Sequence, residues 1–177
     1  MSGRVRVFIG CSLDGFIAGP NDDLSWLPPP VEGDDHGYAA FFAGVGALLM
    51  GRRTYDVVTT FGSWPYEDRP VLVATRRPLT PKVPTARPVQ GPITDLVVEA
   101  RAAAQGRDVY VDGGDVIRQA LDADLIDALT VTIVPVILGA GHPLFAGATR
   151  RQALTVTGNR MTRGLVQLDL APARHAP

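Results

Sequence analysis

The sequence predicts an α/β fold with a mostly parallel sheet and an antiparallel edge. Short apolar segments alternate with helical segments along most of the chain, which is typical of parallel strands joined by crossover helices. Two of these apolar segments end in glycine directly before a helix, at Gly51 and at the pair Gly113–Gly114. Residues 153–158 and 165–170 alternate in polarity, and they indicate an antiparallel C-terminal hairpin.

The first strand is expected over residues 4–11, which are rich in β-branched and aromatic side chains. A long loop follows over residues 12–30, because Asp14–Gly15, the segment 19–23 and three prolines supply turn signals. Loops of this length inside a compact domain are usually either functional or disordered. Trp26 and its apolar neighbours indicate that this loop packs against the domain.

Helices and strands then alternate. Asp34 or Asp35 can cap a helix that runs to about Ala43. Residues 45–50 are almost entirely apolar and predict a buried strand, and residues 53–61 predict a helix.

The next region is marked by proline. Residues 69–75 predict a strand, and residues 76–92 hold several prolines with one short strand candidate at 87–90. Thr94 is then expected to cap a helix that runs to about Gln105.

The last elements before the hairpin are the most regular. Residues 108–112 predict a strand that leads through glycine into a helix over residues 114–121. Residues 126–136 are rich in β-branched side chains and predict a long strand.

Length and composition narrow the classes of function. The chain has 177 residues, which suits one domain over residues 1–177. Its net charge of −1 provides no basic surface for nucleic acid. The single cysteine, Cys11, cannot form an internal disulfide, and the three histidines lack metal-ligand spacing, so no metal is expected.

The N-terminus and the hydropathy pattern predict a cytoplasmic protein with no membrane partner. Residues 1–4 lead straight into the first strand, so no signal peptide is expected. No apolar run reaches the roughly 18 residues that cross a bilayer. The Rossmann fingerprint is incomplete because its third glycine is missing, and there is no Walker-type phosphate loop.

Two strand-to-helix junctions nevertheless suit phosphate. A helix N-terminus carries roughly +0.5 of an elementary charge and unpaired N–H groups. Glycine lets a ligand approach the backbone at Gly113 and Gly114, and the amides of residues 115–117 follow. The other junction adds two guanidiniums and a hydroxyl over residues 51–54. Two such junctions in one domain indicate a ligand with more than one phosphate, such as a dinucleotide.

Five motifs occur in order along the chain. They are SLDGFIA at 12–18, LMGRRTY at 49–55, VDGG at 111–114, LID at 125–127, and PVILGAG with PLF at 135–145. With these motifs the chain resembles the dihydrofolate-reductase superfamily. Within it, the chain is most similar to the C-terminal reductase domain of the bifunctional riboflavin-biosynthesis deaminase-reductase and its stand-alone relatives. The zinc-binding signature of the deaminase half is absent.

The resemblance implies a dihydrofolate-reductase-like three-layer fold with about eight strands, a cis peptide bond in the glycine pair, and NADPH across the carboxyl ends of the strands. It implies a homodimer as well. An arginine suits the 2′-phosphate because its planar fork can bind phosphate bidentately. The cofactor-binding residues implied are Ile17, Ala18, Gly51, Arg52, Arg53, Thr54, Thr75, Arg76, Arg77, Gly113, Gly114, Asp115, Val116 and Ile117.

The resemblance leaves the proton donor and the substrate contacts open. Asp35, with Asp34 beside it, stands where dihydrofolate reductases carry their acid, and a buried carboxyl there would have a raised pKa. Either residue can instead be the helix cap. The substrate-binding candidates are Trp26, Leu138, Gly139 and Gly141.

The function implied is NADPH-dependent hydride transfer, similar to 5-amino-6-(5-phosphoribosylamino)uracil reductase of riboflavin biosynthesis. A ribosyl phosphate needs cationic partners, for which Arg52, Arg160 and Arg163 are candidates. The alternatives are a dihydrofolate or pterin reductase, and a nucleotide-binding protein without catalysis.

Overall fold

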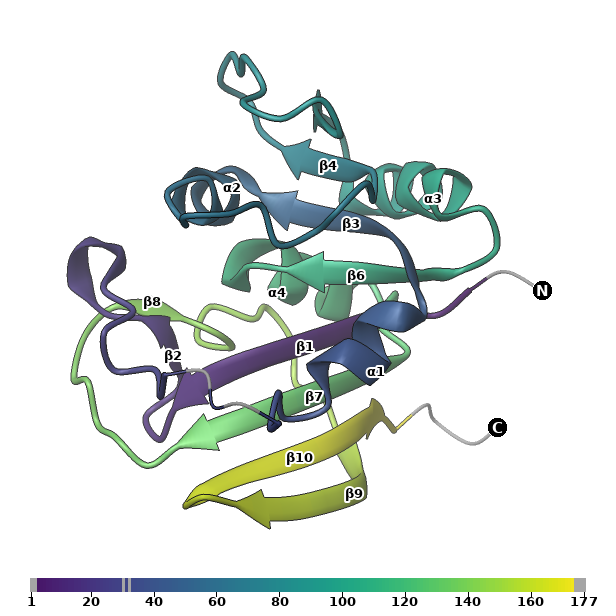
Figure 1. Ribbon diagram of the computed structural model, residues 1–177. Helices are drawn as coiled ribbons and strands as arrows, with labels where there is room; N and C mark the ends of the chain where they lie inside the picture. Colours follow the sequence, from purple (N-terminus) through teal and green to yellow (C-terminus); the bar gives the residue numbers. More distant parts are fainter. Residues whose placement is uncertain (1–2, 30, 32, 174–177) are drawn as a thin grey trace.

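The computed structural model describes residues 3–29, 31 and 33–173. Its eight-stranded sheet has the order β5-β4-β3-β6-β1-β7-β10-β9, which Figure 1 shows from β4 at the top to β9 at the bottom. The first six strands in this order are parallel, and β10 pairs antiparallel with both β7 and β9. These strands are β1 (Val5–Ser12), β3 (Val45–Gly51), β4 (Val71–Ala74), β5 (Ala86–Val89), β6 (Asp108–Asp112), β7 (Ala128–Val134), β9 (Leu154–Thr162) and β10 (Leu165–Pro172).

Helices cover both faces of the sheet, which gives three layers. Helices α3 (Ile93–Ala104) and α4 (Gly114–Asp122) pack in one apolar cluster, and α1 (Tyr38–Ala43) and α2 (Arg52–Val58) pack in another. Strand β3 contributes to both clusters, because successive side chains of a strand point to opposite faces. The predicted α/β class with a mostly parallel sheet is therefore confirmed.

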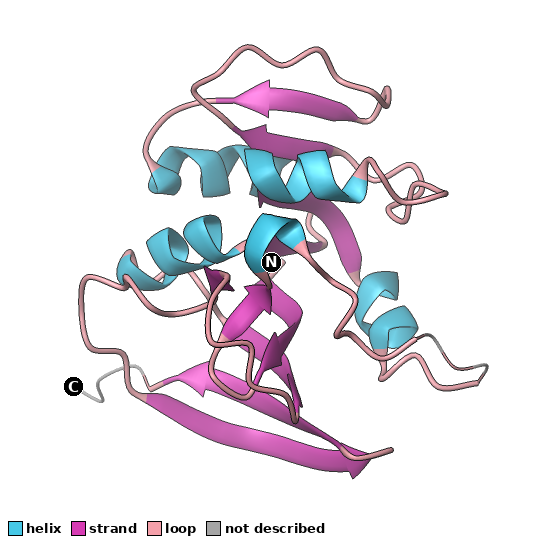
Figure 2. Cartoon of the chain, turned by 90° about the vertical axis from the view of Figure 1, so that its left-hand side faces the viewer, coloured by secondary structure: helices cyan, strands magenta, loops and turns pink. Residues whose placement is uncertain are grey.

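The C-terminal hairpin closes one end of the sheet and forms the long pair of strands at the bottom of Figure 2. Its two-residue turn places Arg163 and Gly164 at φ values of 48° and 78°. Positive φ at both positions is the geometry that matches the twist of paired strands. The hairpin is confirmed, and its strands are longer than the alternating segments predicted.

Several boundaries differ from the prediction, including that of the helix predicted over residues 53–61, which ends at Val58. The helix expected to begin at Asp34 or Asp35 begins at Tyr38, after Gly37 in the left-handed region. Helix α3 begins at Ile93, so Thr94 lies inside it and does not cap it. The strand predicted over residues 126–136 is shorter and covers Ala128–Val134.

The long loop of residues 12–30 contains structure that the turn signals did not reveal. Strand β2 (Phe16–Ala18) pairs antiparallel with β8 (His142–Pro143), and a short 3-10 turn covers Pro20–Asp22. This pairing joins two segments that lie more than 120 residues apart in the chain. It brings the loop back over the carboxyl ends of the parallel strands. Within the described ranges, no helix has the length and apolar character needed to cross a membrane.

Candidate functional site

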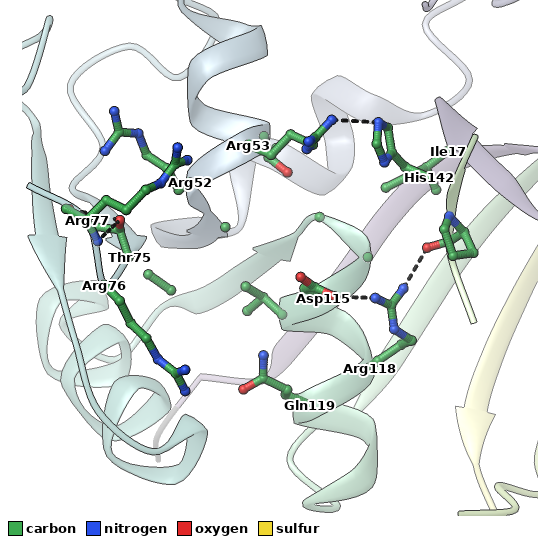
Figure 3. Close-up of a pocket in the computed structure, with 17 residues that line it drawn as sticks. Ile17, Arg52, Arg53, Thr75, Arg76, Arg77, Asp115, Arg118, Gln119 and His142 are labelled. Atoms are coloured by element: carbon green, nitrogen blue, oxygen red, sulfur yellow. Dashed lines mark hydrogen bonds and ion pairs between the residues drawn. The ribbon is translucent and has the colours of Figure 1, made fainter. Parts of the chain in front are cut away.

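The first cavity lies where the carboxyl ends of the parallel strands meet, and its volume is about 440 Å³. Its walls come from the starts of α2 and α4, the loop after β4, and the β2–β8 pair (Figure 3). Ligands of open α/β sheets bind outside this edge. Every residue expected to bind the cofactor lines the first cavity, except Ala18 and Ile117.

Two helix starts face the first cavity without side-chain caps. Gly51 precedes α2 and Gly113 precedes α4, and neither glycine has a side chain that could accept the first amides. Such starts favour an anion, because the amide groups and the helix dipole point toward it. Ile117 is fully buried, and its amide donates to the Gly113 carbonyl at 3.0 Å, so it is part of the helix rather than of the cavity wall.

The glycine pair lets three elements meet at one point. A Cβ atom at Gly113 would lie 2.3 Å from Thr54 Oγ1, and one at Gly114 would lie 2.4 Å from the Pro143 carbonyl oxygen. The absence of these side chains therefore allows α2, α4 and β8 to surround the first cavity. The Gly113–Gly114 peptide bond is trans, so the expectation of a cis bond was wrong.

The arginines of the first cavity differ in their partners. Arg52 donates from Nε to Asp56 at 2.9 Å and from Nη1 to the Pro78 carbonyl at 2.9 Å. Arg77 lies 4.0 Å from the same Asp56 carboxylate. Arg76 is exposed and forms no ion pair or side-chain hydrogen bond with the described residues, and it extends along the cavity wall toward Gln119 in Figure 3. Arg76 is thus the cation best placed to meet an added anion.

Arg118 lines the first cavity and was not among the residues predicted from the sequence. Its Nη1 donates to the Pro143 carbonyl at 2.6 Å, and its Nη2 pairs with Asp115. These bonds tie the first turns of α4 to β8 on one side of the first cavity (Figure 3). A lone arginine within a helix carries no sequence signal for such a contact.

A second cavity of about 240 Å³ adjoins the first. The two cavities share Ile17, Arg53, Thr54 and His142 as wall residues. Most of the second cavity is apolar, with side chains from β1, from the loop after β2 and from α2, and Ala18 also lines it.

A cluster of three polar side chains closes the boundary between the cavities. Arg53 Nη1 lies 3.1 Å from Asp22 Oδ1 and 2.8 Å from His142 Nε2. His142 Nε2 also lies 3.1 Å from Asp22 Oδ1. This cluster links the start of α2 to both segments of the β2–β8 region.

Asp112, at the end of β6, is a half-buried acid in the wall of the second cavity. Its Oδ1 accepts the Gly113 amide at 2.8 Å, and the Tyr66 hydroxyl donates to Oδ2 at 3.4 Å. Burial raises the pKa of Asp112 to about 6, because desolvation outweighs these hydrogen bonds. Burial and the nearby Asp112 carboxyl also raise the pKa of Tyr66 well above its ordinary value, so Tyr66 stays a donor.

Asp112 belongs to the VDGG motif at 111–114, and the motif alone predicted no role for it. The available signal was a carboxyl group at the end of an otherwise apolar strand, directly before two glycines. Parallel strands deliver such residues to the ligand-binding edge.

Asp34 and Asp35 lie outside both cavities. Asp35 accepts the amides of Gly37 and Ala39, the second at 2.6 Å, which is the capping role considered as the alternative. Asp34 accepts the His36 amide and the Thr162 hydroxyl. These hydrogen bonds hold the pKa of both carboxyls below the usual range, so the expectation of a raised pKa was wrong.

The substrate-binding candidates also lie outside the cavity walls. Trp26 donates from Nε1 to the Asp23 carbonyl at 3.1 Å, within its own loop. The amides of Leu138 and Gly139 donate to Asp14 at 3.1 and 2.7 Å, which ties this loop to the end of β1. Gly141 packs against the Ala18 carbonyl, where a Cβ atom would approach to 2.1 Å.

No group of metal ligands is present among the residues the structure describes.

The RibD C-terminal domain family model matches residues 4–168 of the chain. A putative riboflavin biosynthesis protein of Shewanella sp. PV-4 has a similar structure, with a TM-score of 0.87, 32% identity, and coverage of 97% of this chain and 99% of that one. YwjB of Bacillus subtilis, an uncharacterised protein, is 29% identical over 98% of this chain and 100% of its own length.

The fold also occurs in a two-activity enzyme. The diaminohydroxyphosphoribosylaminopyrimidine deaminase/5-amino-6-(5-phosphoribosylamino)uracil reductase of Thermotoga maritima matches with a TM-score of 0.69 and 15% identity. The match covers 97% of this chain and 57% of that protein. At this identity the similarity concerns the fold.

Proposed function

This chain belongs to the RibD C-terminal domain family, and we propose that it is an NADPH-dependent reductase of a small heterocyclic substrate. The observation that carries this proposal is the pair of adjoining cavities, which share Ile17, Arg53 and Thr54 in their walls. Ligands in the two cavities would meet along these residues. A cofactor and a substrate need this arrangement for direct transfer between them.

The first cavity fits a phosphorylated dinucleotide. The uncapped start of α4 offers backbone amides to a pyrophosphate, and Gly114 lets this helix start pack directly against the Pro143 carbonyl of β8. Arg76 supplies a guanidinium without a described partner for a 2′-phosphate. When bound, NADPH supplies a hydride for the carbon of a C=N or C=O bond, whose heteroatom then takes up a proton.

Residues of the second cavity would position the substrate, provide a proton to it and keep water away from it. Leu24 and Leu27 cover it with apolar surface. The Asp112 carboxyl, with a pKa of about 6, holds a proton in part of the molecules near neutral pH and accepts hydrogen bonds in the rest. Tyr66 donates to Asp112 and fixes its orientation.

A dihydrofolate reductase of the usual kind needs an acid at Asp34 or Asp35, and neither residue lines the cavities. We therefore place the acid at Asp112 and favour a reductase similar in reaction type to the uracil reductases of the family. In line with the sequence, we also propose that the protein acts in the cytoplasm as a homodimer.

The test is a parallel titration of the protein with NADPH and with NADH, followed by tryptophan fluorescence. Wild type is expected to bind NADPH more tightly, and Arg76→Ala to lower NADPH affinity by about tenfold to a hundredfold while NADH affinity is unchanged. Arg151→Ala, which removes an exposed arginine outside the first cavity, is the matched control. Absence of binding by either nucleotide would refute the proposal. Binding without NADPH oxidation over a substrate panel would indicate the non-catalytic alternative.

A further inference from the structure

The charges of the second cavity are unsuited to an anionic substrate. Among the described residues that line it, Asp22 and Asp112 are carboxylic acids and Arg53 is the one guanidinium. The hydroxyl groups of Tyr66 and Tyr110 lie at the end occupied by Asp112. A phosphate that enters this cavity would therefore meet two carboxyl groups, and the basic side chains near it, Arg53 and His142, already contact Asp22.

The guanidinium of Arg53 is already engaged. Its Nη1 lies 3.1 Å from Asp22 Oδ1 and 2.8 Å from His142 Nε2. Because Nη1 is paired, a substrate phosphate could reach Arg53 only through Nε or Nη2, and it would then lie beside the Asp22 carboxyl. The acid next to this guanidinium disfavours a second anion there.

The other arginines expected to neutralise a substrate phosphate lie outside the second cavity. Arg52 faces the first cavity and is bound to Asp56. Arg163, in the turn of the C-terminal hairpin, has its Nε 3.4 Å from Asp34 Oδ2. Arg160 lines a separate hollow beside α1. None of the three lines the second cavity.

Size and lining favour a compact, largely apolar ligand. The cavity volume of about 240 Å³ lies below the roughly 300–1,000 Å³ that is usual for drug-sized ligands. Leu24, Leu27, Val57 and Phe61 line the part away from Asp112. A bound substrate would have to place uncharged surface against these four apolar side chains.

Resting on the reductase function proposed above, we infer that the second cavity takes an uncharged heterocycle whose N–H groups donate to Asp112, and that this substrate carries no phosphate. A carboxylate accepts hydrogen bonds through both oxygens, and Asp112 Oδ1 accepts the Gly113 amide at 2.8 Å. The Tyr110 hydroxyl also lies against this carboxyl, but its short hydrogen bond, at 2.8 Å, goes to the Phe8 carbonyl. The weaker 3.4 Å contact with Tyr66 leaves capacity for a substrate donor. The chain thus keeps the reductase fold and differs in substrate from enzymes that act on phosphoribosyl compounds.

The test uses two compounds that differ by one phosphate: 5-amino-6-(5-phosphoribosylamino)uracil and its dephosphorylated riboside. Binding of each is measured by calorimetry with and without NADPH, and kcat/KM is measured from NADPH oxidation. The dephosphorylated compound is expected to bind at least as tightly, with a kcat/KM about tenfold higher or more. A preference for the phosphorylated compound, or binding of neither compound, would overturn the inference. Failure to bind NADPH in the separate titration would instead overturn the proposed function.

A variant tests the reason for the preference. Phe61 is 46% exposed at the cavity wall, so Phe61→Arg adds a free cation without disturbing the core. This variant is expected to shift the ratio of the two affinities toward the phosphorylated compound by about tenfold. Phe61→Gln is the neutral control and should leave the ratio unchanged. An unchanged ratio in Phe61→Arg would show that missing positive charge is not what excludes phosphate, and the inference would fail.

Discussion

Replacement of Asp112 by asparagine is expected to remove a pH-dependent loss of stability. The pKa of Asp112 is about 6 in the folded protein and 3.8 in the reference state without burial. Between these two pH values the folded protein holds a proton that the unfolded chain has released, so stability falls as pH rises. The stabilising contribution of the neutral carboxyl is fully present below pH 3.8 and is lost as pH passes through about 6.

The difference between these two pKa values corresponds to about 3 kcal/mol of unfolding free energy. This figure is an upper limit, because the Asp112 residue keeps partial contact with solvent through the second cavity. Asparagine cannot ionise, and its side-chain oxygen can still accept the Gly113 amide, which Asp112 accepts at 2.8 Å. The gain of Asp112→Asn over wild type should therefore grow from acid to neutral pH.

The assay is urea unfolding of wild type and Asp112→Asn at intervals from about pH 4 to about pH 8, without cofactor. The gain should increase by up to about 3 kcal/mol over this range and level off above about pH 7. Asp95→Asn, at an exposed position on α3, is the matched control for the loss of one carboxylate. A flat difference for Asp112→Asn would mean that burial does not raise its pKa, and the acid role proposed for it would lose its support.

Three further measurements test the packing, the core and the assembly. Gly113→Ala should lower the unfolding free energy by about 1–3 kcal/mol, because φ is +91° and the new Cβ would lie 2.3 Å from Thr54 Oγ1. Gly62→Ala, at an open position, should be close to neutral in the same denaturation experiment. Burial raises the pKa of the Cys11 thiol, so Cys11 should react with a thiol reagent only under unfolding conditions, and rapid reaction of the native protein would contradict this. If the proposed homodimer pairs through β9, Met161→Lys, which changes a 78% exposed side chain, should shift light-scattering mass toward the monomer.

Local sequence signals predicted most of the sheet. Strand β3 is buried along almost its whole length, so it reads as a continuous apolar run, and β6 is bounded by aspartates at both ends. The β2–β8 pair was not predictable in this way. It consists of a three-residue and a two-residue strand, and its partners come together only after the chain has folded around them. The start of α1 was misplaced because Asp35 caps from outside the helix, through the amides of Gly37 and Ala39.

Part of the candidate site was likewise predictable from local sequence, and part of it was not. The residues of the first cavity follow strand ends directly, so their positions could be predicted from glycine and arginine next to apolar runs. The acid could not be chosen in this way, because a carboxyl's pKa depends on what surrounds it in space. Asp35 is exposed and bonded to amides, whereas Asp112 is surrounded by side chains from distant segments, including Tyr66 and Tyr110. The apolar strand and the two glycines next to Asp112 indicate its place at the edge of the sheet, but they do not indicate the distant side chains that surround it there.

The end of β6 lies between the proposed cofactor cavity and the proposed substrate cavity. Asp112 faces the second cavity, and Gly113 and Gly114 open the start of α4 to the first cavity. The Gly113 amide donates to Asp112 at 2.8 Å, so the backbone conformation that opens the helix start also orients the acid. A change at Gly113 therefore alters both cavities together, whereas a change at Arg76 or Phe61 alters only one. Separate effects of the last two substitutions, and a joint effect of the first on NADPH affinity and on substrate turnover, would establish that this junction couples cofactor position to the acid.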